Sequence, residues 1–152
     1  MALLRIRKFP DPALKQAAKP VENINGQLAG FIDSMVQTMY AAPGVGLAAP
    51  QLGLALQLAV IEDREEYHKE VSPALLKERE RSPVPFHVLI NPVIEEMGDG
   101  RAEFFEGCLS LPGLVKAISL PERQLCNACF HGRYPMAIDG ATEKLSLEQA
   151  RP

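Results

Sequence analysis

The longest regular pattern of apolar residues lies between residues 25 and 42. There, apolar side chains return at steps of three and four residues, the spacing that places them on one face of an α-helix. They are Leu28, Phe31, Ile32, Met35, Val36, Met39 and Tyr40. Asn25 can cap the start of such a helix, and Pro43-Gly44 would end it. The pattern therefore predicts one long helix from about residue 25 to residue 42.

Shorter apolar runs predict β-strands in the rest of the chain. They cover residues 55–61, 86–90, 93–97 and 101–105, with a turn at 98–100 before the last of them. Short strands combined with one long helix predict an α+β fold, in which mainly antiparallel strands pack around the helix. Residues 62–81 carry many charges of both signs. We expect them to form a solvated surface segment without chemistry, with a short helix near 73–79.

Length and composition narrow the class of protein. A chain of 152 residues suits one domain, and 47% apolar with 23% charged residues is typical of a soluble globular protein. A formal charge of −3 gives no reason to expect nucleic-acid binding. No apolar stretch approaches the ~20 residues of a membrane span, and the N-terminal one is too short for a signal peptide. Three cysteines, an odd number, argue against a secreted disulfide framework and favour the cytoplasm.

Residues 44–51, with the sequence Gly-Val-Gly-Leu-Ala-Ala-Pro-Gln, form the first candidate motif. Gly44 and Gly46, with Val45 between them, permit a backbone path that closes tightly over a ligand. Gln51 carries an amide that can donate a hydrogen bond to a developing oxyanion. Without further context, glycines after a helix more often form its C-cap and the following turn than a ligand site.

Residues 106–110 form the second candidate motif, Glu-Gly-Cys-Leu-Ser. A lone cysteine such as Cys108 is more often a small buried apolar residue than a metal ligand. Its thiolate could nevertheless hold Fe²⁺ or Zn²⁺ and leave a position open for water. The setting of the cysteine therefore decides between the two interpretations.

The two motifs, in this order and around the strand that ends in Asn91-Pro92, resemble the first two signature motifs of the peptide deformylases. The resemblance covers residues 1–118, and 119–152 would be a divergent or truncated tail of the same domain. It implies metal-dependent removal of the formyl group from N-formyl-methionyl nascent peptides, with the ribosome as one place of encounter. Cys108 would be a ligand of Fe²⁺ or Zn²⁺, and Gln51 and the Leu109 amide would hold the oxyanion. The implied substrate groove is lined by Gly44, Val45, Gly46, Glu106 and Gly107.

The third motif of the family, a helical H-E-x-x-H with two metal ligands and the general base, is absent from the sequence. The histidines are His68, His87 and His131, and no two of them are four residues apart. Because such a metal site needs both imidazoles and the carboxylate, we expect a chain of family identity without turnover. His68 and His87 are expected to be structural or solvent-exposed.

Three alternatives remain open at this stage. The chain could bind formyl-methionyl peptides without hydrolysing them. Cys126 and Cys129, with His131 and Cys108, could form a closed zinc site or a redox pair, although recognised zinc patterns have two ligand pairs. The chain could also fold poorly, because the helix that carries the third motif is missing.

Both the strand pattern and the resemblance weaken after Ile118. A shifted reading frame or a divergent terminal exon would explain this change. If neither of the other two frames of the gene encodes H-E-x-x-H downstream, the frameshift hypothesis fails and divergence remains.

Overall fold

A computed structural model describes residues 2–78, 81–93, 101–111 and 115–121. Its elements in chain order are the 3-10 helix η1 (Pro12–Lys15), α1 (Gly26–Ala41), β1 (Gly46–Ala48), the 3-10 helix η2 (Ala49–Leu52), β2 (Leu58–Asp63), α2 (Glu65–His68), α3 (Pro73–Glu78), β3 (Val84–Ile90), β4 (Arg101–Gly107) and β5 (Val115–Pro121). The tail from residue 122 onward lies outside the described residues.

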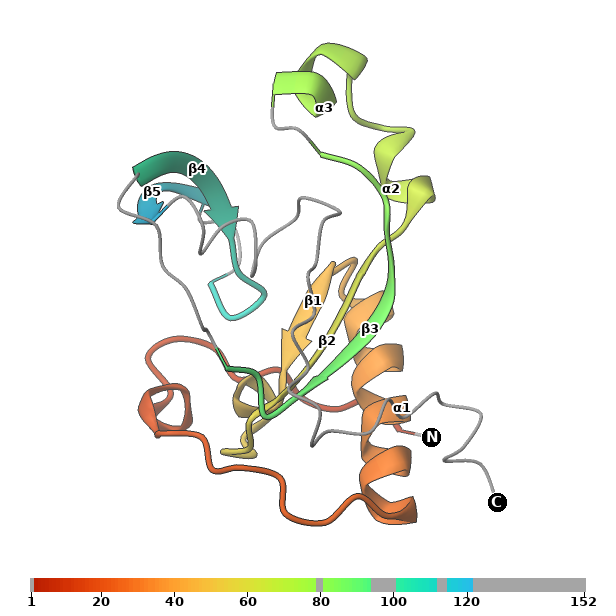
Figure 1. The fold of residues 1–152 in the computed structure, drawn as a ribbon, viewed down its shortest axis with the longest axis vertical. Coiled ribbons are helices and arrows are strands. Elements are labelled where there is room, and N and C mark those ends of the chain that lie inside the picture. The colour runs from red at the N-terminus through yellow and green to blue at the C-terminus, as the bar shows by residue number, and fades with distance from the viewer. Residues whose placement is uncertain (1, 79–80, 94–100, 112–114, 122–152) are drawn as a thin grey trace.

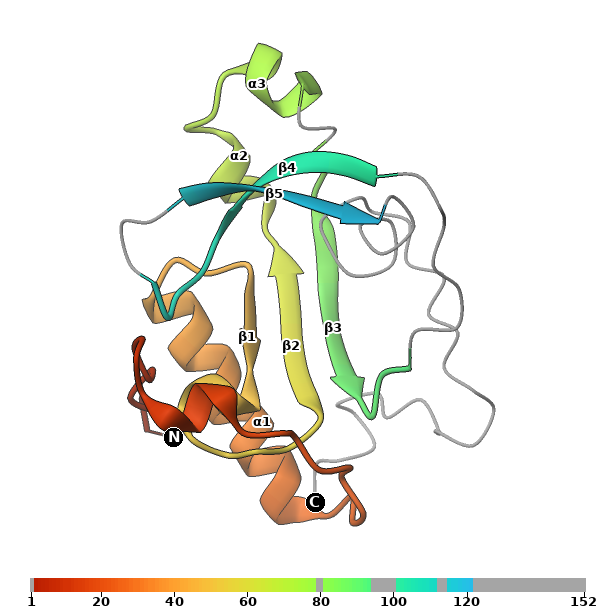
Figure 2. The same ribbon diagram turned by 90° about the vertical axis from the view of Figure 1, so that its left-hand side faces the viewer.

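One antiparallel sheet organises the fold. Its strands lie in the order β1-β2-β3, and α1 covers one of its faces (Figure 1). Strands β4 and β5 form a second, two-stranded antiparallel sheet on the other side, across one end of the first sheet (Figure 2). The predicted α+β class with mainly antiparallel strands is confirmed.

The core lies between α1 and the three-stranded sheet. Its fully buried centre consists of Met35 and Met39 from the helix, with Leu47 and Val60 from β1 and β2. Burying each such side chain stabilises the fold by roughly 1.5–3 kcal/mol. The predicted helix is confirmed, and Asn25 caps it: its side-chain oxygen accepts hydrogen bonds from the N–H groups of residues 27 and 28, at 3.1 and 3.0 Å.

The strand ends differ from the prediction. β2 begins at Leu58 because residues 55–57 pair with the N-terminal segment instead: the Lys19 N–H donates to the Ala55 carbonyl, and the Gln57 N–H to the Lys19 carbonyl, both at 2.8 Å. β4 pairs along its length with β5. The strand expected at 93–97 lies outside the described residues from 94 onward.

Asn91 fastens the start of the chain to the end of β3. Its backbone has a φ of 49°, in the left-handed region that asparagine tolerates. Its side chain accepts from the Val21 N–H at 2.7 Å and donates to the Val21 carbonyl at 2.9 Å.

Among the described helices, none is both long enough and apolar enough to cross a membrane.

Candidate functional site

The two sequence motifs meet in space. η2 follows β1 directly and carries Gln51, while the loop that contains Cys108 begins where β4 ends. The Gln51 side-chain nitrogen lies 3.1 Å from the Ser110 hydroxyl oxygen and 3.6 Å from the Cys108 sulfur. Side chains more than 50 positions apart in sequence therefore lie within contact distance of one another.

The orientation of the Gln51 amide follows from its surroundings. The Ala48 N–H can only donate, and it lies 2.9 Å from the Gln51 Oε1. The NH₂ group must therefore be the end that faces Ser110 and Cys108. The Ser110 side chain is buried and the Cys108 thiol is exposed. One N–H is thus held by a buried hydroxyl, while the other lies beside an accessible sulfur.

The loop after Cys108 is a tight turn, because the Leu111 N–H donates to the Cys108 carbonyl at 2.9 Å. The Leu109 side chain is half-buried and packs against the core. Its own N–H has no acceptor among the described residues. The Leu109 amide lies in the loop between Cys108 and Ser110, the two residues that the Gln51 amide contacts.

Position 44 is packed closely against Leu109. A Cβ there would lie 2.6 Å from the Leu109 Cδ1, so any side chain would push that leucine away. Val45 accepts a hydrogen bond from the Glu62 N–H at 3.0 Å, and Gly46 pairs with Ile61 across β1 and β2. The glycine segment is therefore fixed by the sheet on one side and touches the Cys108 loop on the other.

Two further candidate residues lie at the end of β4. Gly107 is exposed, and a Cβ there would meet open space. The backbone of Glu106 pairs with Lys116, but its side chain lies outside the described part of the chain.

The structure describes His68, which lies in α2, and His87, which lies in β3. Residues 2–78, 81–93, 101–111 and 115–121 contain no group of three His, Cys, Asp or Glu side chains able to hold a metal ion. The candidates Cys126, Cys129 and His131 lie outside the described residues.

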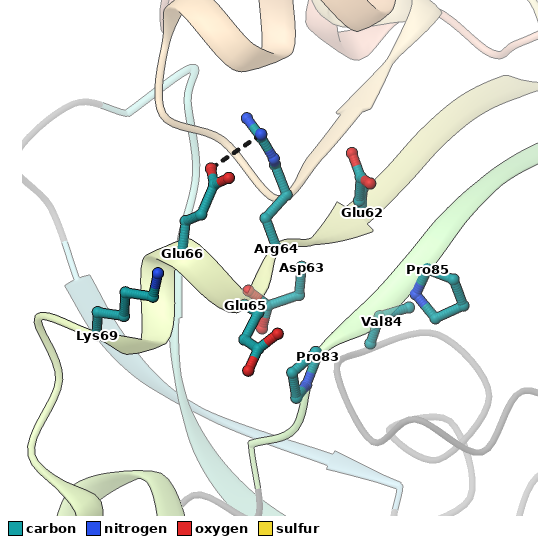
Figure 3. Close-up of a pocket in the computed structure, with 9 residues that line it drawn as sticks. All are labelled: Glu62, Asp63, Arg64, Glu65, Glu66, Lys69, Pro83, Val84 and Pro85. Atoms are coloured by element: carbon teal, nitrogen blue, oxygen red, sulfur yellow. Dashed lines mark ion pairs between the residues drawn. The ribbon is translucent and has the colours of Figure 1, made fainter.

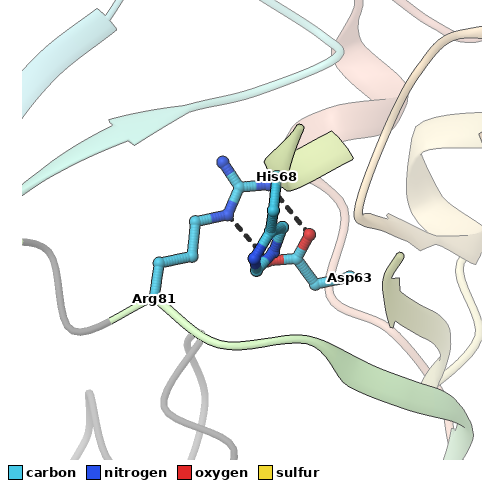
Figure 4. Close-up of polar contacts among 3 residues, drawn as sticks. All are labelled: Asp63, His68 and Arg81. Carbon is cyan, nitrogen blue, oxygen red and sulfur yellow. Dashed lines mark hydrogen bonds and ion pairs between the residues drawn. The ribbon is translucent and has the colours of Figure 1, made fainter. Parts of the chain in front are cut away.

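Asp63, His68 and Arg81 form a polar cluster that the sequence did not predict (Figure 4). Asp63 is 1% exposed and accepts two hydrogen bonds from the Arg81 guanidinium, at 2.7 and 2.8 Å. This pairing raises the pKa of Arg81. The His68 Nε2 lies 3.0 Å from the same carboxylate, an ion-pair distance without the alignment of a hydrogen bond. The expectation that all of 62–81 lies on the surface is therefore wrong at Asp63.

Next to this cluster lies an open depression of about 500 Å³ (Figure 3). It is lined by Glu62, Asp63, Arg64, Glu65, Glu66, Lys69, Pro83, Val84 and Pro85. At its edge the Tyr40 hydroxyl donates to Glu62, and Arg64 lies 5.0 Å above the Tyr40 ring. Burial, with Glu62 adding to it, raises the pKa of Tyr40 to about 12. The depression shares no residue with the Gln51–Cys108 site.

Comparison with known proteins identifies the fold family. A family model described as polypeptide deformylase matches residues 3–124. Peptide deformylase 3 of Streptomyces avermitilis is 47% identical over 126 residues, covering 81% of this chain and 54% of that protein. Peptide deformylase 1 of Streptomyces coelicolor is 52% identical over 134 residues, covering 85% and 57%. The chain thus spans little more than half the length of these two curated relatives.

Solved structures agree. Peptide deformylase from Thermotoga maritima has a TM-score of 0.61 and 35% identity, covering 80% of this chain and 69% of that one. A peptide deformylase from Synechococcus elongatus in complex with actinonin has a TM-score of 0.63 and 39% identity, covering 78% and 57%. With the family model matching most of its length, the chain belongs to the polypeptide deformylase family.

Proposed function

We propose that this chain recognises N-formyl-methionyl peptides at the junction of the glycine segment and the Cys108 loop. The observation that carries the proposal is the Gln51 amide. Its oxygen is fixed by the Ala48 N–H, and its nitrogen is directed at Ser110 and Cys108 from the other motif. A donor held in this way pays little reorganisation cost when it meets a ligand oxygen.

The reaction of the family is the hydrolysis of the formyl amide. Water adds to the formyl carbon, the C–N bond breaks, formate leaves, and the new amine takes up a proton. Negative charge collects on the formyl oxygen during the addition. The Gln51 N–H and the Leu109 N–H would stabilise that oxygen, and Gly44, Val45 and Gly46 would line the groove beside the peptide. Each oxyanion donor of this kind is worth roughly 10²–10³ in rate in the enzymes where it has been removed.

The metal that the family uses fits this chain only in part. The exposed Cys108 thiol is a suitable soft ligand for Fe²⁺ or Zn²⁺. A catalytic site of this class needs about three protein ligands, and the described residues offer no such group. The sequence also lacks H-E-x-x-H. We therefore assign no step to a metal and expect the chain, as given, to show no turnover.

A second candidate follows from the same geometry. The Gln51 and Leu109 amides would be available to a formyl oxygen although the described residues offer no group of three metal ligands, and this favours binding of formyl-methionyl peptides without hydrolysis. Such nascent peptides, met in the cytoplasm or at the ribosome, would be the partners. A zinc or thiol module at Cys126 and Cys129 remains a prediction that no described residue supports.

The test compares binding and turnover of a short formyl-methionyl peptide, with Fe²⁺ supplied anaerobically. We expect measurable binding, no turnover, and weaker binding of the same peptide without its formyl group. Gln51→Ala should weaken formyl-peptide binding about 3- to 10-fold, the usual effect of one lost hydrogen bond. Gln27→Ala, at an exposed helical position, is the matched control and should have no effect.

Two results would change this picture. Turnover that Cys108→Ala abolishes would mean that residues elsewhere in the chain complete the metal site. Equal affinity for the formylated and unformylated peptides would overturn the proposed recognition altogether.

A further inference from the structure

The segment at residues 7–9 passes between the two motifs and contacts both. The Arg7 N–H donates to the Gln51 carbonyl at 2.6 Å, and the Phe9 N–H donates to the Ser110 carbonyl at 3.0 Å. One backbone donor thus goes to each motif. Because a short segment with such bonds on both flanks acts as a crosslink, the relative position of Gln51 and the Cys108 loop depends on it.

Lys8 lies between these two backbone contacts. Its ammonium group donates to the Leu109 carbonyl, 101 residues away in sequence. The carbonyls of Cys108, Leu109 and Ser110 each have a donor, in order the Leu111 N–H, the Lys8 ammonium and the Phe9 N–H. Three successive peptide planes are therefore held.

The held planes orient the backbone amide that the proposed function uses beside the Gln51 side chain. The Leu109 N–H belongs to the same peptide unit as the Cys108 carbonyl, so fixing that carbonyl fixes the N–H. Hydrogen bonding at the carbonyl of a peptide unit also strengthens its N–H as a donor. A loop free to rotate at Leu109 would lose this direction.

The 7–9 segment is itself anchored. The Leu4 N–H donates to the Thr38 hydroxyl oxygen of α1 at 2.9 Å. The Arg7 guanidinium lies against Gly53, where a Cβ would come within 3.0 Å of the Arg7 Nε, and it contacts Asp11 at 3.5 Å. Fixed points on both sides of Lys8 limit how far it can move away from the Cys108 loop.

From these contacts we propose that Lys8 is a positioning residue: it holds the Leu109–Ser110 peptide group, at the centre of the turn, and so limits the rotation at Leu109 that would turn the neighbouring Leu109 N–H away from the ligand oxygen. The 7–9 segment is then the third part of the site, beside the glycine segment and the Cys108 loop. The effect of Lys8 on ligand binding rests on the proposed function. Its effect on the order of the loop does not.

The test uses the full chain with Lys8→Met, which keeps the length of the side chain and removes its donor. Lys8→Arg keeps a donor, and Lys15→Met is the matched control at an exposed position at the end of η1. Hydrogen exchange at the Leu111 amide reports the order of the loop. We expect exchange to be about fivefold faster in Lys8→Met, near wild type in Lys8→Arg, and unchanged in Lys15→Met.

Ligand binding provides the second readout. Lys8→Met should weaken binding of the formyl peptide about fivefold, as expected for the loss of one oriented donor, and leave binding of the unformylated peptide unchanged. Lys8→Arg should restore the preference. An equal loss for both peptides, with a lower Tm and no rescue by arginine, would show a merely structural residue and overturn the proposal.

The two proposals fail in different ways. If the wild-type chain does not distinguish the formylated peptide, the proposed function is lost, and exchange at Leu111 still decides whether Lys8 orders the loop. If the wild-type chain does distinguish it while Lys8→Met changes neither exchange nor preference, the role of Lys8 is overturned and the function stands.

Discussion

Replacement of Arg81 by methionine should destabilise the fold strongly, because it leaves the Asp63 carboxylate buried without its main partner. That carboxylate is 1% exposed and accepts two guanidinium hydrogen bonds, at 2.7 and 2.8 Å. Breaking a buried pair from one side costs about 3–5 kcal/mol. The Arg81 side chain is 22% exposed and His68 remains 3.0 Å from the carboxylate, so the lower end applies. We expect a loss of about 3 kcal/mol.

Denaturant unfolding followed by circular dichroism measures this loss. In a chain of 152 residues, about 3 kcal/mol corresponds to a fall in Tm of roughly 6–12 °C. Arg64→Met removes the same charge from an exposed pair with Glu66 and should change stability far less. The double variant Asp63→Asn/Arg81→Met should lose less than the two single variants together, because no buried charge is left behind. If Arg81→Met and Arg64→Met unfold at the same denaturant concentration, the buried pair does not stabilise the fold as argued.

Three other predictions concern single positions. Gly44→Ala should cost about 1 kcal/mol, the lower end for overpacking, because the Leu109 Cδ1 that its Cβ would approach to 2.6 Å is the end of a side chain that can move. A cost that persists in a Leu109→Ala background would contradict that contact as the cause. Asn25→Ala should cost about 1 kcal/mol by removing the cap of α1, measured by thermal unfolding, whereas Asn25→Asp should not. The folded-state pKa of Tyr40, about 12, exceeds its ordinary value of 10.0. Its contribution to the free energy of unfolding is therefore complete below pH 10 and is lost as pH rises towards 12. A stability profile of Tyr40→Phe with the same slope as wild type over that range would show that Tyr40 is not responsible.

Features specified by nearby residues could be predicted from the sequence. The helix from residue 26 to residue 41 has its apolar face, its cap at Asn25 and its end at Pro43 all within its own stretch. The strand ends were less accurate because pairing depends on distant partners. Residues 55–57 have strand-forming composition, yet they pair with Lys19 instead of extending β2.

The candidate site was named through family resemblance, and its geometry could not be worked out from residue patterns. The contact of Gln51 with Cys108 and Ser110 joins segments whose distance in sequence says nothing about their distance in space. Asp63 is paired with Arg81, 18 residues later, and lies beside a register shift between β2 and β3. The signal available was an acidic residue at the end of an apolar run.

Nothing in the sequence indicated that residues 7–9 bind both motifs. Two of the three hydrogen bonds come from backbone N–H groups, which any residue other than proline could supply. A pattern of side-chain types cannot reveal such a contact. Of the three links to the two motifs, the one from Lys8 uses a side chain, and an exposed lysine is ordinarily solvated.

The contacts of the N-terminal segment join residues far apart in sequence, and this has a consequence for how the protein is made. Val21 is synthesised 70 residues before its partner Asn91, and Lys8 is synthesised 101 residues before Leu109. At synthesis rates of about 5–20 residues per second, the second partner follows several seconds after the first. Contacts between residues so far apart in sequence form slowly, because a long loop must close first. The segment that is made early is therefore among the last to be placed, and the site is assembled only when the Cys108 loop has left the ribosome.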